Sequence, residues 1–389
     1  MKTSILATTA CTLPLLIAPL YASGAFYGDP PDNNHPWTVH DGNRPQPPRV
    51  EPATFSTQEN PGKPPSDAVI LFDGSKAAIN NWLSDTQPPE ATKWENKDGS
   101  LQCVPGSGYI RSKEEFGDCQ LHIEWSAPAQ VQGDGQGRGN SGVFLMGEIE
   151  VQVLDNYNNP AYADGFAGSV YGVNPPLVNA LNKPGEWQVF DIVFRRPVYQ
   201  NGKLLDSGYL TVHCNGVLIQ DHTPLEGGGG HKSRTKDRPY PEKGPLKLQD
   251  HGNPVRYRNV WIRPLPKRAS EGGDTSVMSR EATAAKRATI AKDIREAATK
   301  LTGNEKTLHL MESLCYEKDA AVIKQANAMT DEFVAKIKQV PADQLESQKA
   351  EIVQLDKALQ YLAAHKLAKF AAAGEIRKVM VKQEWDEKK

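Results

Sequence analysis

RGNSGVFLMGEIEVQVLD, residues 138–155, alternates polar and apolar residues in its second half over the length of a strand. Successive side chains of a β-strand point to opposite faces. The pattern therefore predicts that Glu148, Glu150 and Gln152 share one face. The other face is apolar and would pack into a core: Ile149, Val151 and Val153. A strand face with two carboxylates and an amide is either a solvated surface or the floor of a sugar-binding cleft.

Similar patterns continue on both sides of this stretch, through residues 67–266. Because many short strands with frequent turn signals are typical of a sandwich or a barrel, this region is predicted to be mainly β. Asn215-Gly216 predicts a two-residue hairpin, since both turn positions favour positive φ. The expected strand regions are separated by Gly, Pro, Asn and Asp: 68–72, 100–104, 119–125, 143–154, 187–194, 209–214, 217–220, 246–249 and 255–262. Long connections at 156–185 and 222–244 would line a site or be disordered.

The N-terminal residues 1–25 fit a secretory signal peptide. They contain a positive start at Met1-Lys2, a largely apolar run to Leu20, and small residues suited to cleavage. The apolar run is shorter than the roughly 20 residues that a membrane span needs. We therefore expect an exported protein, periplasmic or extracellular, with no transmembrane segment in the mature chain.

Two further segments differ from the β-like region. Residues 26–66 are rich in Pro, Asn, Gly and Asp, which predicts a linker or an irregular wrap around the domain edge. Residues 270–389 are richer in Ala, Lys, Glu and Gln, and their apolar spacing predicts a small helical hairpin or bundle. The expected helical regions are 282–301, 305–340 and 343–382. No catalytic constellation stands out there.

Charge and cysteine content narrow the function classes. The net charge is −2, the pI is about 6.5, and no basic block suggests a nucleic-acid or membrane-surface partner. Of the five cysteines, Cys11 would leave with the signal peptide. Cys103 and Cys119 lie on successive expected strands and would form either a disulfide or buried free thiols. No CxxC pair or Cys/His spacing argues for zinc.

Seven strings in a fixed order carry a family resemblance. They are LFDG at 71–74, FGDCQLHIEW at 116–125, GNSGVFL at 139–145, EVQVLD at 150–155, YADGFAGSVYG at 162–172, KPGEWQ at 183–188 and GPLKLQDHGNPVRYRNVWIRPL at 244–265. Together they resemble the 3-keto-disaccharide hydrolase domain family. The resemblance implies a concanavalin- or laminarinase-like jelly-roll β-sandwich with its cleft on the concave face, in an exported protein that acts on sugars oxidised at C3. Residues 1–66 and 267–389 lie outside it.

A ketone at C3 changes how a glycoside can be cleaved. The C2 hydrogen becomes acidic, a base can remove it, and the C1 substituent can leave by elimination before water adds. The protein must supply a base, a stabiliser for the enolate oxygen, and an acid for the leaving group. A divalent metal could be the stabiliser, as a Lewis acid on the ketone; the alternative is that no cofactor takes part. Such a substrate, a 3-keto oligosaccharide or glycoside, also implies a sugar 3-dehydrogenase acting upstream.

Glu150 and His251 are the proposed catalytic residues and the tentative metal ligands. Glu150 lies mid-strand on the polar face, although a solvated face is the alternative. His251 ends a strand on the same side as Gln249, and histidine suits proton transfer or metal coordination near neutral pH. Its alternative role is to cap the turn at Gly252. Asp250 would point the other way and orient a loop or a backbone amide.

The expected substrate-binding residues surround this pair. Arg138 would neutralise an enolate or bind a hydroxyl pair, and Asn140 would either bind substrate or belong to a turn. Aromatic rings would stack on sugar or, alternatively, belong to the core. The complete set is Arg138, Asn140, Glu148, Gln152, Tyr157, Tyr171, Trp187 and Gln249. Arg256 and Arg258 share a face of the last strand and are expected to be structural, on the convex sheet or paired with carboxylates.

Two other functions remain open at this point. A two-carboxylate glycoside hydrolase would use Glu148 and Glu150, whose Cα atoms would lie about 6.7 Å apart on one strand, and retaining enzymes hold their carboxyl groups about 5–5.5 Å apart. Gln152 argues against this mechanism, because a third acid is expected at that position. A carbohydrate-binding module without catalysis is the other alternative, with the helical segment attaching it to a partner.

Overall fold

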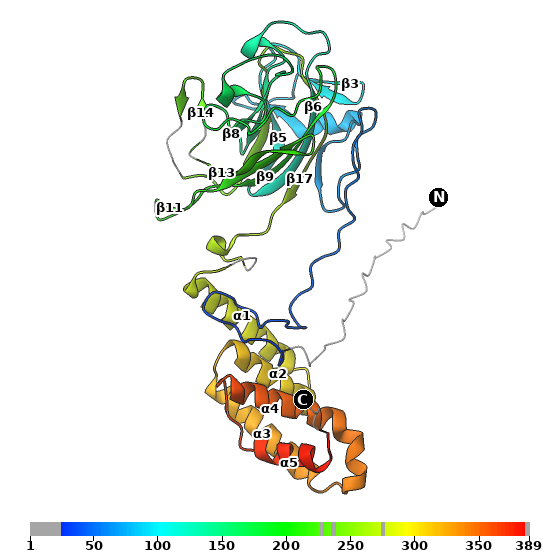
Figure 1. The fold of residues 1–389 in the computed structure, drawn as a ribbon, viewed down its shortest axis with the longest axis vertical. Helices are drawn as coiled ribbons and strands as arrows, with labels where there is room; N and C mark the ends of the chain where they lie inside the picture. Colours follow the sequence, from blue (N-terminus) through cyan, green and yellow to red (C-terminus); the bar gives the residue numbers. More distant parts are fainter. Residues whose placement is uncertain (1–24, 226, 228, 235–238, 274–276, 386–389) are drawn as a thin grey trace, which may run out of the picture. The chain divides into compact units, whose positions relative to one another are not determined.

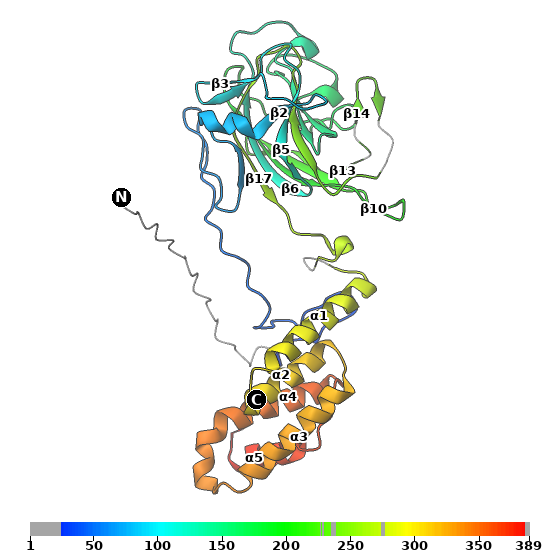
Figure 2. The same ribbon diagram turned by 180° about the vertical axis from the view of Figure 1, so that it is seen from behind.

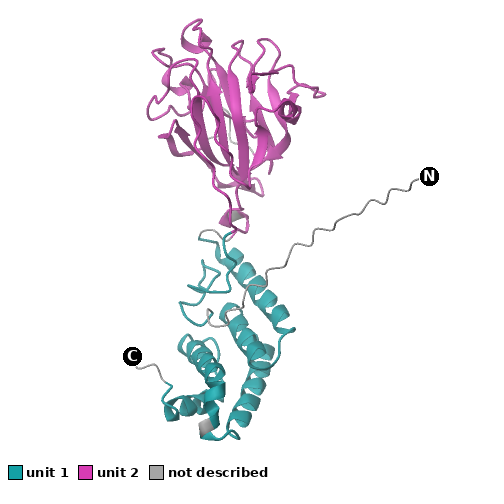
Figure 3. Ribbon diagram, turned by 90° about the vertical axis from the view of Figure 1, so that its right-hand side faces the viewer, with its two compact units in different colours: residues 1–47, 276–389 teal, residues 48–275 magenta. Residues whose placement is uncertain are grey.

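The computed structural model describes residues 25–225, 227, 229–234, 239–273 and 277–385. It divides into two compact units, residues 48–275 and residues 1–47 with 276–389, which Figure 3 colours separately. The expected signal peptide falls almost wholly outside the described residues. Among the residues described, no helix has both the length and the apolar character that a bilayer crossing requires.

The unit formed by residues 48–275, the β unit, contains two antiparallel sheets (Figures 1 and 2). The larger sheet has the order β13-β12-β9-β6-β17-β4-β3, with β1 also paired to β17, and the smaller has the order β2-β5-β16-β7-β8. This architecture confirms the predicted jelly-roll sandwich. The strands are β1 Val69–Phe72, β2 Trp82–Ser84, β3 Glu95–Lys97, β4 Ser100–Gln102, β5 Ile110–Phe116, β6 Cys119–Ser126, β7 Ser141–Leu145, β8 Ile149–Val153, β9 Gln188–Arg195, β12 Tyr209–Cys214, β13 Val217–Pro224, β16 Gly244–Leu248 and β17 Arg256–Pro264.

Shorter elements complete the β unit. Two small two-stranded sheets consist of β10 Val198–Gln200 with β11 Lys203–Asp206, and β14 Gly229–Gly230 with β15 Ser233–Arg234. Short 3-10 helices are η1 Lys76–Asn81, η2 Gly135–Gly137, η3 Ala163–Gly165 and η4 Ala269–Glu271.

The core lies between the two large sheets and is built from alternate residues of each strand. From β8 it receives Ile149, Val151 and Val153, all fully buried, as the alternation predicts. The intervening residues of the smaller sheet point outward, and these are the residues that could form a site. The described cysteines, Cys103, Cys119, Cys214 and Cys315, are free and buried, so Cys103 and Cys119 form no disulfide.

The predicted single strand region 143–154 is instead a hairpin. Met146 and Gly147 adopt φ of 52° and 69°, and the chain reverses there so that Leu145 pairs with Ile149. Glu148 consequently lies in the turn and is exposed, which corrects its predicted place on the strand face. The hairpin at Asn215-Gly216 is confirmed, with Cys214 paired to Val217.

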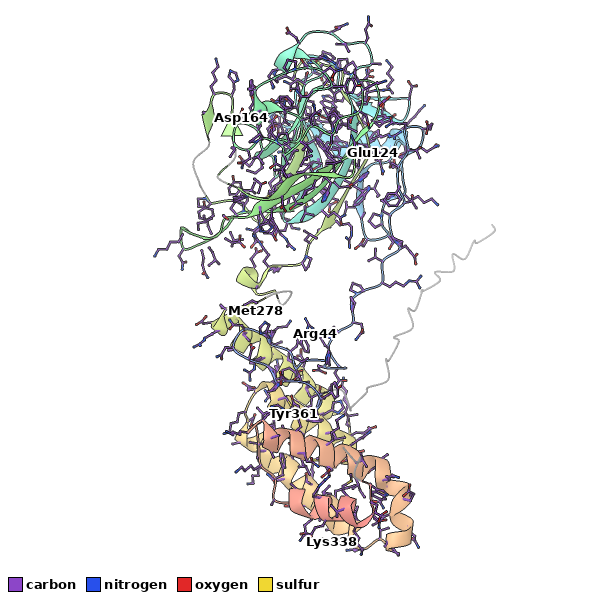
Figure 4. The ribbon with its side chains drawn as sticks, in the orientation of Figure 1. Arg44, Glu124, Asp164, Met278, Lys338 and Tyr361 are labelled. Atoms are coloured by element: carbon purple, nitrogen blue, oxygen red, sulfur yellow. The ribbon has the colours of Figure 1, made fainter. Side chains whose placement is uncertain are left out.

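The unit formed by residues 1–47 and 276–389, the helical unit, has a separate core. Part of the Pro-rich segment belongs to it, because Phe26 is buried in this core and Tyr361 donates a hydrogen bond to the carbonyl of Gly28 at 2.7 Å. Figure 4 labels Tyr361 and Met278 in this unit. The helices are α1 Arg280–Ala298, α2 Gly303–Tyr316, α3 Ala320–Ile337, η5 Ala342–Gln348, α4 Lys349–Ala364 and α5 Ala373–Lys382.

The last part of the Pro-rich segment, residues 51–66, lies against the larger sheet through contacts such as Ser56 with Glu124, and we call it the strap. It has no assigned strand, but Thr54 N–H donates to the Lys63 carbonyl at 3.0 Å and Ser66 N–H donates to the Glu51 carbonyl at 3.1 Å. Gly62 is required at this crossing, since a Cβ there would overlap the carbonyl oxygen of Thr54. The strap is therefore a doubled-back segment with defined contacts.

Candidate active site

The outer face of the smaller sheet carries a row of side chains that crosses four strands. Strand pairing puts Glu150 opposite Phe144, Phe144 opposite Lys247, and Lys247 opposite Arg111. At the sheet edge, Tyr171 N–H donates to the Glu150 carbonyl at 3.2 Å. Glu150 thus lies between two aromatic residues, Tyr171 and Phe144.

A second row runs beside the first. Gln152 pairs with Gly142, whose carbonyl accepts a hydrogen bond from Gln249 N–H at 3.0 Å. The Gln249 side chain donates in turn to the hydroxyl of Tyr109 at 2.7 Å. The structure therefore brings together three residues that the sequence proposed for this face: Glu150, Gln152 and Gln249.

Glu150 is buried, with 8% of its surface exposed, and its carboxyl group has no hydrogen-bond or ion-pair partner among the described residues. Gly142 makes room for it, because a Cβ at that position would overlap Glu150 Oε1. Burial raises the pKa of Glu150 to about 8, since a carboxylate loses hydration there without gaining a partner. Glu150 therefore titrates close to neutral pH, where a group that both takes and gives protons is an effective acid–base catalyst.

The amides beside Glu150 hold one another in place. Gln152 Nε2 donates to Asn140 Oδ1 at 3.1 Å, and Asn140 Nδ2 donates to the Gln136 carbonyl at 2.7 Å. Both Gln152 and Asn140 are buried. Asn140 therefore orients Gln152, and the two amides form a buried support beside Glu150.

Tyr109 and Lys247 are hydrogen-bond donors on the same face of the sheet as Glu150. Tyr109 accepts from Gln249, so its own hydroxyl proton is available to a ligand. Burial raises the pKa of Tyr109, and the negative charge of Glu150 adds to the rise. Lys247 Nζ pairs with Asp85 Oδ2 at 2.8 Å, and the pair is about three-quarters buried.

A cavity of about 490 Å³ is lined by Tyr171, whose backbone N–H donates to the Glu150 carbonyl, although Glu150 itself does not line it. Tyr162 and Tyr171 form one wall, and their hydroxyl oxygens lie 2.9 Å apart. The opposite wall comes from the 222–244 connection, through residues such as Lys232. Residues of the two long connections, 156–185 and 222–244, thus meet at one cavity.

His251 lies beyond the end of β16 and is exposed. In the sheet, Lys247 pairs with Phe144, and Phe144 pairs with Glu150. His251 lies four residues after Lys247 and therefore beyond the row that contains Glu150. The described residues show no hydrogen bond or ion pair between His251 and Glu150. Asp250 points away, as expected, and accepts from the backbone amides of Gly108 and Gly252, each at 2.9 Å.

The side chains near Glu150 do not form a metal site. In the part of the chain that the structure describes, no group of three or more His, Cys, Asp or Glu side chains could hold a metal ion.

Other predicted binding residues have structural partners. Arg138 donates to Asp155 at 2.7 Å and to the Tyr157 carbonyl at 3.0 Å, and both contacts tie the loop after β8 to the loop before β7. Trp187 lies on the outer face of the larger sheet, where the Arg258 guanidinium stands 4.2 Å from its ring centre. Arg258 also pairs with Glu124 at 2.7 Å, which confirms its predicted structural role.

The sequence patterns did not single out Tyr109, Lys247 or Phe144. Each occupies an outward position of a strand or a strand end, so alternation within its own strand was the available signal. Their importance depends on β16 lying between β5 and β7, which no local pattern reveals.

Comparison with known proteins agrees with this fold. A family model for the 3-keto-alpha-glucoside-1,2-lyase-like domain matches residues 67–263. A Parabacteroides distasonis ATCC 8503 protein of known structure, provisionally named a glycosyl hydrolase, is 39% identical; the match covers 58% of this chain and 95% of that chain, with a TM-score of 0.54. A second protein from the same organism, with the same provisional name, is 19% identical over 51% of this chain and 94% of that chain, with a TM-score of 0.38. No curated protein matches the chain.

Proposed function

The chain belongs to the 3-keto-alpha-glucoside-1,2-lyase-like family of carbohydrate-active hydrolases and lyases, and we propose that it cleaves 3-keto-glycosides with Glu150 as the base. The observation that carries the proposal is the buried Glu150 carboxyl group, which has no partner among the described residues and lies between Tyr171 and Phe144. A substrate hydrogen next to a ketone is acidic enough for such a carboxylate to remove.

The proposed reaction begins at C2. The Glu150 carboxylate takes the C2 proton, and the C–H electron pair becomes the C2–C3 double bond of an enolate whose charge lies on the C3 oxygen. The Tyr109 hydroxyl and the Lys247 ammonium are the donors on the same face that would stabilise this oxygen. Phe144 stands between Glu150 and Lys247 in the cross-strand row, and its ring, whose centre is 5.9 Å from that of Tyr109, would support a sugar ring.

Elimination completes the cleavage. The enolate reforms the ketone, its electron pair makes a C1–C2 double bond, and the bond from C1 to the leaving oxygen breaks. The leaving oxygen takes a proton, for which protonated Glu150 is the proposed source. Water then adds across the double bond to give the free 3-keto sugar, so the net result is hydrolysis.

His251 has a secondary place in this proposal. It is exposed at the loop that follows β16, so a role on the incoming water fits better than one at C2. We further propose that the protein is exported, as its first 25 residues suggest, and that a sugar 3-dehydrogenase supplies its substrate.

The alternative functions differ from the proposal in their site requirements. A two-carboxylate hydrolase is disfavoured because Glu148 is exposed in the β7–β8 turn and Gln152 is an amide, so β8 supplies one outward carboxylate. A binding module has no use for a buried carboxyl group without a partner, whose burial costs stability.

The decisive experiment uses purified protein with a 3-keto-glucoside and its unoxidised parent, each with and without a chelator. We expect turnover of the keto sugar only, in the presence or absence of chelator. Turnover of the parent would support an ordinary glycoside hydrolase, and turnover of neither would support the binding module.

A further inference from the structure

A second cavity, of about 690 Å³, lies on the outer face of the larger sheet, beneath the strap. Strands β6, β9 and β17 form its floor, and residues 53–58 of the strap form one wall. Its volume falls in the range of about 300–1,000 Å³ that is typical of small-molecule sites. Figure 4 labels Glu124, which belongs to this floor.

Hydrogen bonds fix the strap over this floor. Ser56 Oγ donates to Glu124 Oε1 at 2.6 Å, and Arg258 Nη1 donates to the Gln58 carbonyl at 3.1 Å. Gln58 also forms two hydrogen bonds with the backbone of Trp187, at 2.6 and 3.0 Å. A ligand would therefore meet a preformed site and would not have to order a loop, which favours affinity.

The charges that line the cavity are balanced. His122 lies 2.7 Å from Asp191 and 3.4 Å from Glu124, and Arg258 neutralises Glu124 from the other side. Two positive and two negative side chains thus face one another, which disfavours both anions and cations as ligands. Asp191 is 45% exposed, and no described residue donates to its second carboxylate oxygen. That oxygen can accept a hydrogen bond from a ligand hydroxyl group.

Aromatic side chains complete the lining. Phe55 of the strap is fully exposed, although it borders the cavity, and Trp187, which also lines it, is half-buried with the Arg258 guanidinium over its ring. An aromatic ring at the edge of a cavity can cover the apolar face of a ligand. Sugars combine such an apolar face with a rim of hydroxyl groups.

We propose that this cavity is a second carbohydrate-binding site, which holds a neutral sugar of one or two units without converting it. Glu124 is fully buried and engaged by several donors, and Asp191 is paired with His122, so the cavity offers no free acid–base pair for cleavage. The proposal goes beyond the chemistry at Glu150 and does not depend on it.

The test measures binding of maltose, cellobiose, sucrose and trehalose by calorimetry, in the full chain carrying Glu150→Gln. We expect saturable binding of at least one sugar, weakened at least tenfold by Phe55→Ala and by Asp191→Ala. Val193→Ala is the matched control, because Val193 is exposed on the same face of β9 but does not line the cavity. Circular dichroism would establish that each variant is folded.

The outcomes separate this proposal from the catalytic one. Absence of saturable binding for all four sugars, or binding unchanged by Phe55→Ala and Asp191→Ala, would overturn it. With Glu150 intact, Phe55→Ala should leave kcat and KM for a 3-keto-glucoside unchanged. A tenfold fall in kcat on Phe55→Ala would show that the two cavities act as one site and would also refute the inference.

Discussion

Glu150 combines burial with the absence of a partner, and this combination has two measurable consequences. Its pKa is raised from 4.5 to about 8, so the folded protein prefers the neutral acid over most of the neutral range. The base form, which the proposed reaction needs, accumulates as the pH rises through 8. As the pH rises, activity should therefore increase and the stability of the folded protein should decrease.

Glu150→Gln should abolish activity and stabilise the β unit. We expect kcat to fall by about 10²–10⁴-fold, because a proton-transfer group is lost. The pKa of Glu150 is higher in the folded state than in the unfolded state, so protonation of Glu150 stabilises the folded state. This stabilisation is complete below about pH 4.5 and is lost as the pH rises through 8. At about pH 8.5 the variant should therefore be more stable, by on the order of 4 kcal/mol, and near pH 4.5 equally stable. Urea unfolding at both pH values measures this, and equal stability at the higher pH would contradict the assignment.

Gly142→Ala probes the space that Glu150 occupies. A Cβ would overlap Glu150 Oε1, and the carboxyl group would have to move. We expect the variant to fold, since the flexible end of a side chain gives way, while kcat/KM falls roughly 10²-fold because the base is displaced. Steady-state kinetics with circular dichroism tests this. Unchanged kcat/KM would mean that the position of the carboxyl group does not matter.

Among the secondary-structure elements, those that depend on neighbouring residues could be predicted from the sequence, and those that depend on distant strands could not. The polar and apolar faces of β8 were predicted, and so was the Asn215-Gly216 hairpin, because both depend on neighbouring residues. The β7–β8 turn was missed because Met146 occupies a positive φ that its residue type does not favour. Pairing between β16 and β7 was also unpredictable, and it places Gln249 and Lys247 in the site while leaving His251 at the rim. Strand register over a hundred residues is a property of the whole sheet.

Arg258 on β17 secures the strap and should matter more than an exposed arginine on the same strand. Arg258→Leu leaves Glu124 buried without its main counter-charge and removes two hydrogen bonds to the strap, to Gln58 and Thr57. We expect a loss of about 3 kcal/mol in the free energy of unfolding.

Arg263→Leu is the control for that measurement. Its pair with Asp67 is 32–41% exposed, and such pairs contribute about 0–1 kcal/mol. Urea unfolding compares the two variants directly. Similar losses in both would refute the special role of Arg258.

At the scale of the whole molecule, two separate cores and several buried titratable groups determine the response to pH. Burial disfavours the cationic form of His122, but its hydrogen bonds to Asp191 and Glu124 outweigh this and raise its pKa to about 9. Burial raises the pKa of Glu312 in the helical unit to about 7. Each of these groups stabilises the folded state when it is protonated. This stabilisation is present at lower pH and is lost as the pH rises through the group's pKa in the folded state.

Calorimetry should therefore resolve two unfolding transitions, one for each core, with both moving to lower temperature as the pH increases from about 5 to 9. Glu312→Gln should reduce the pH dependence of the helical transition, while Glu150→Gln should reduce that of the β transition. A single transition, or one variant shifting both, would mean that the units unfold together.

The strap also has a consequence for the time at which the chain folds during synthesis. Residues 57 and 58 are made early, yet Arg258, to which they bind, is 200 residues further along. A ribosome must release almost the entire β unit before this closure can form. Until then Glu124 remains without its guanidinium partner. The last β-strand to emerge, β17, therefore completes the larger sheet and also binds the strap to that sheet.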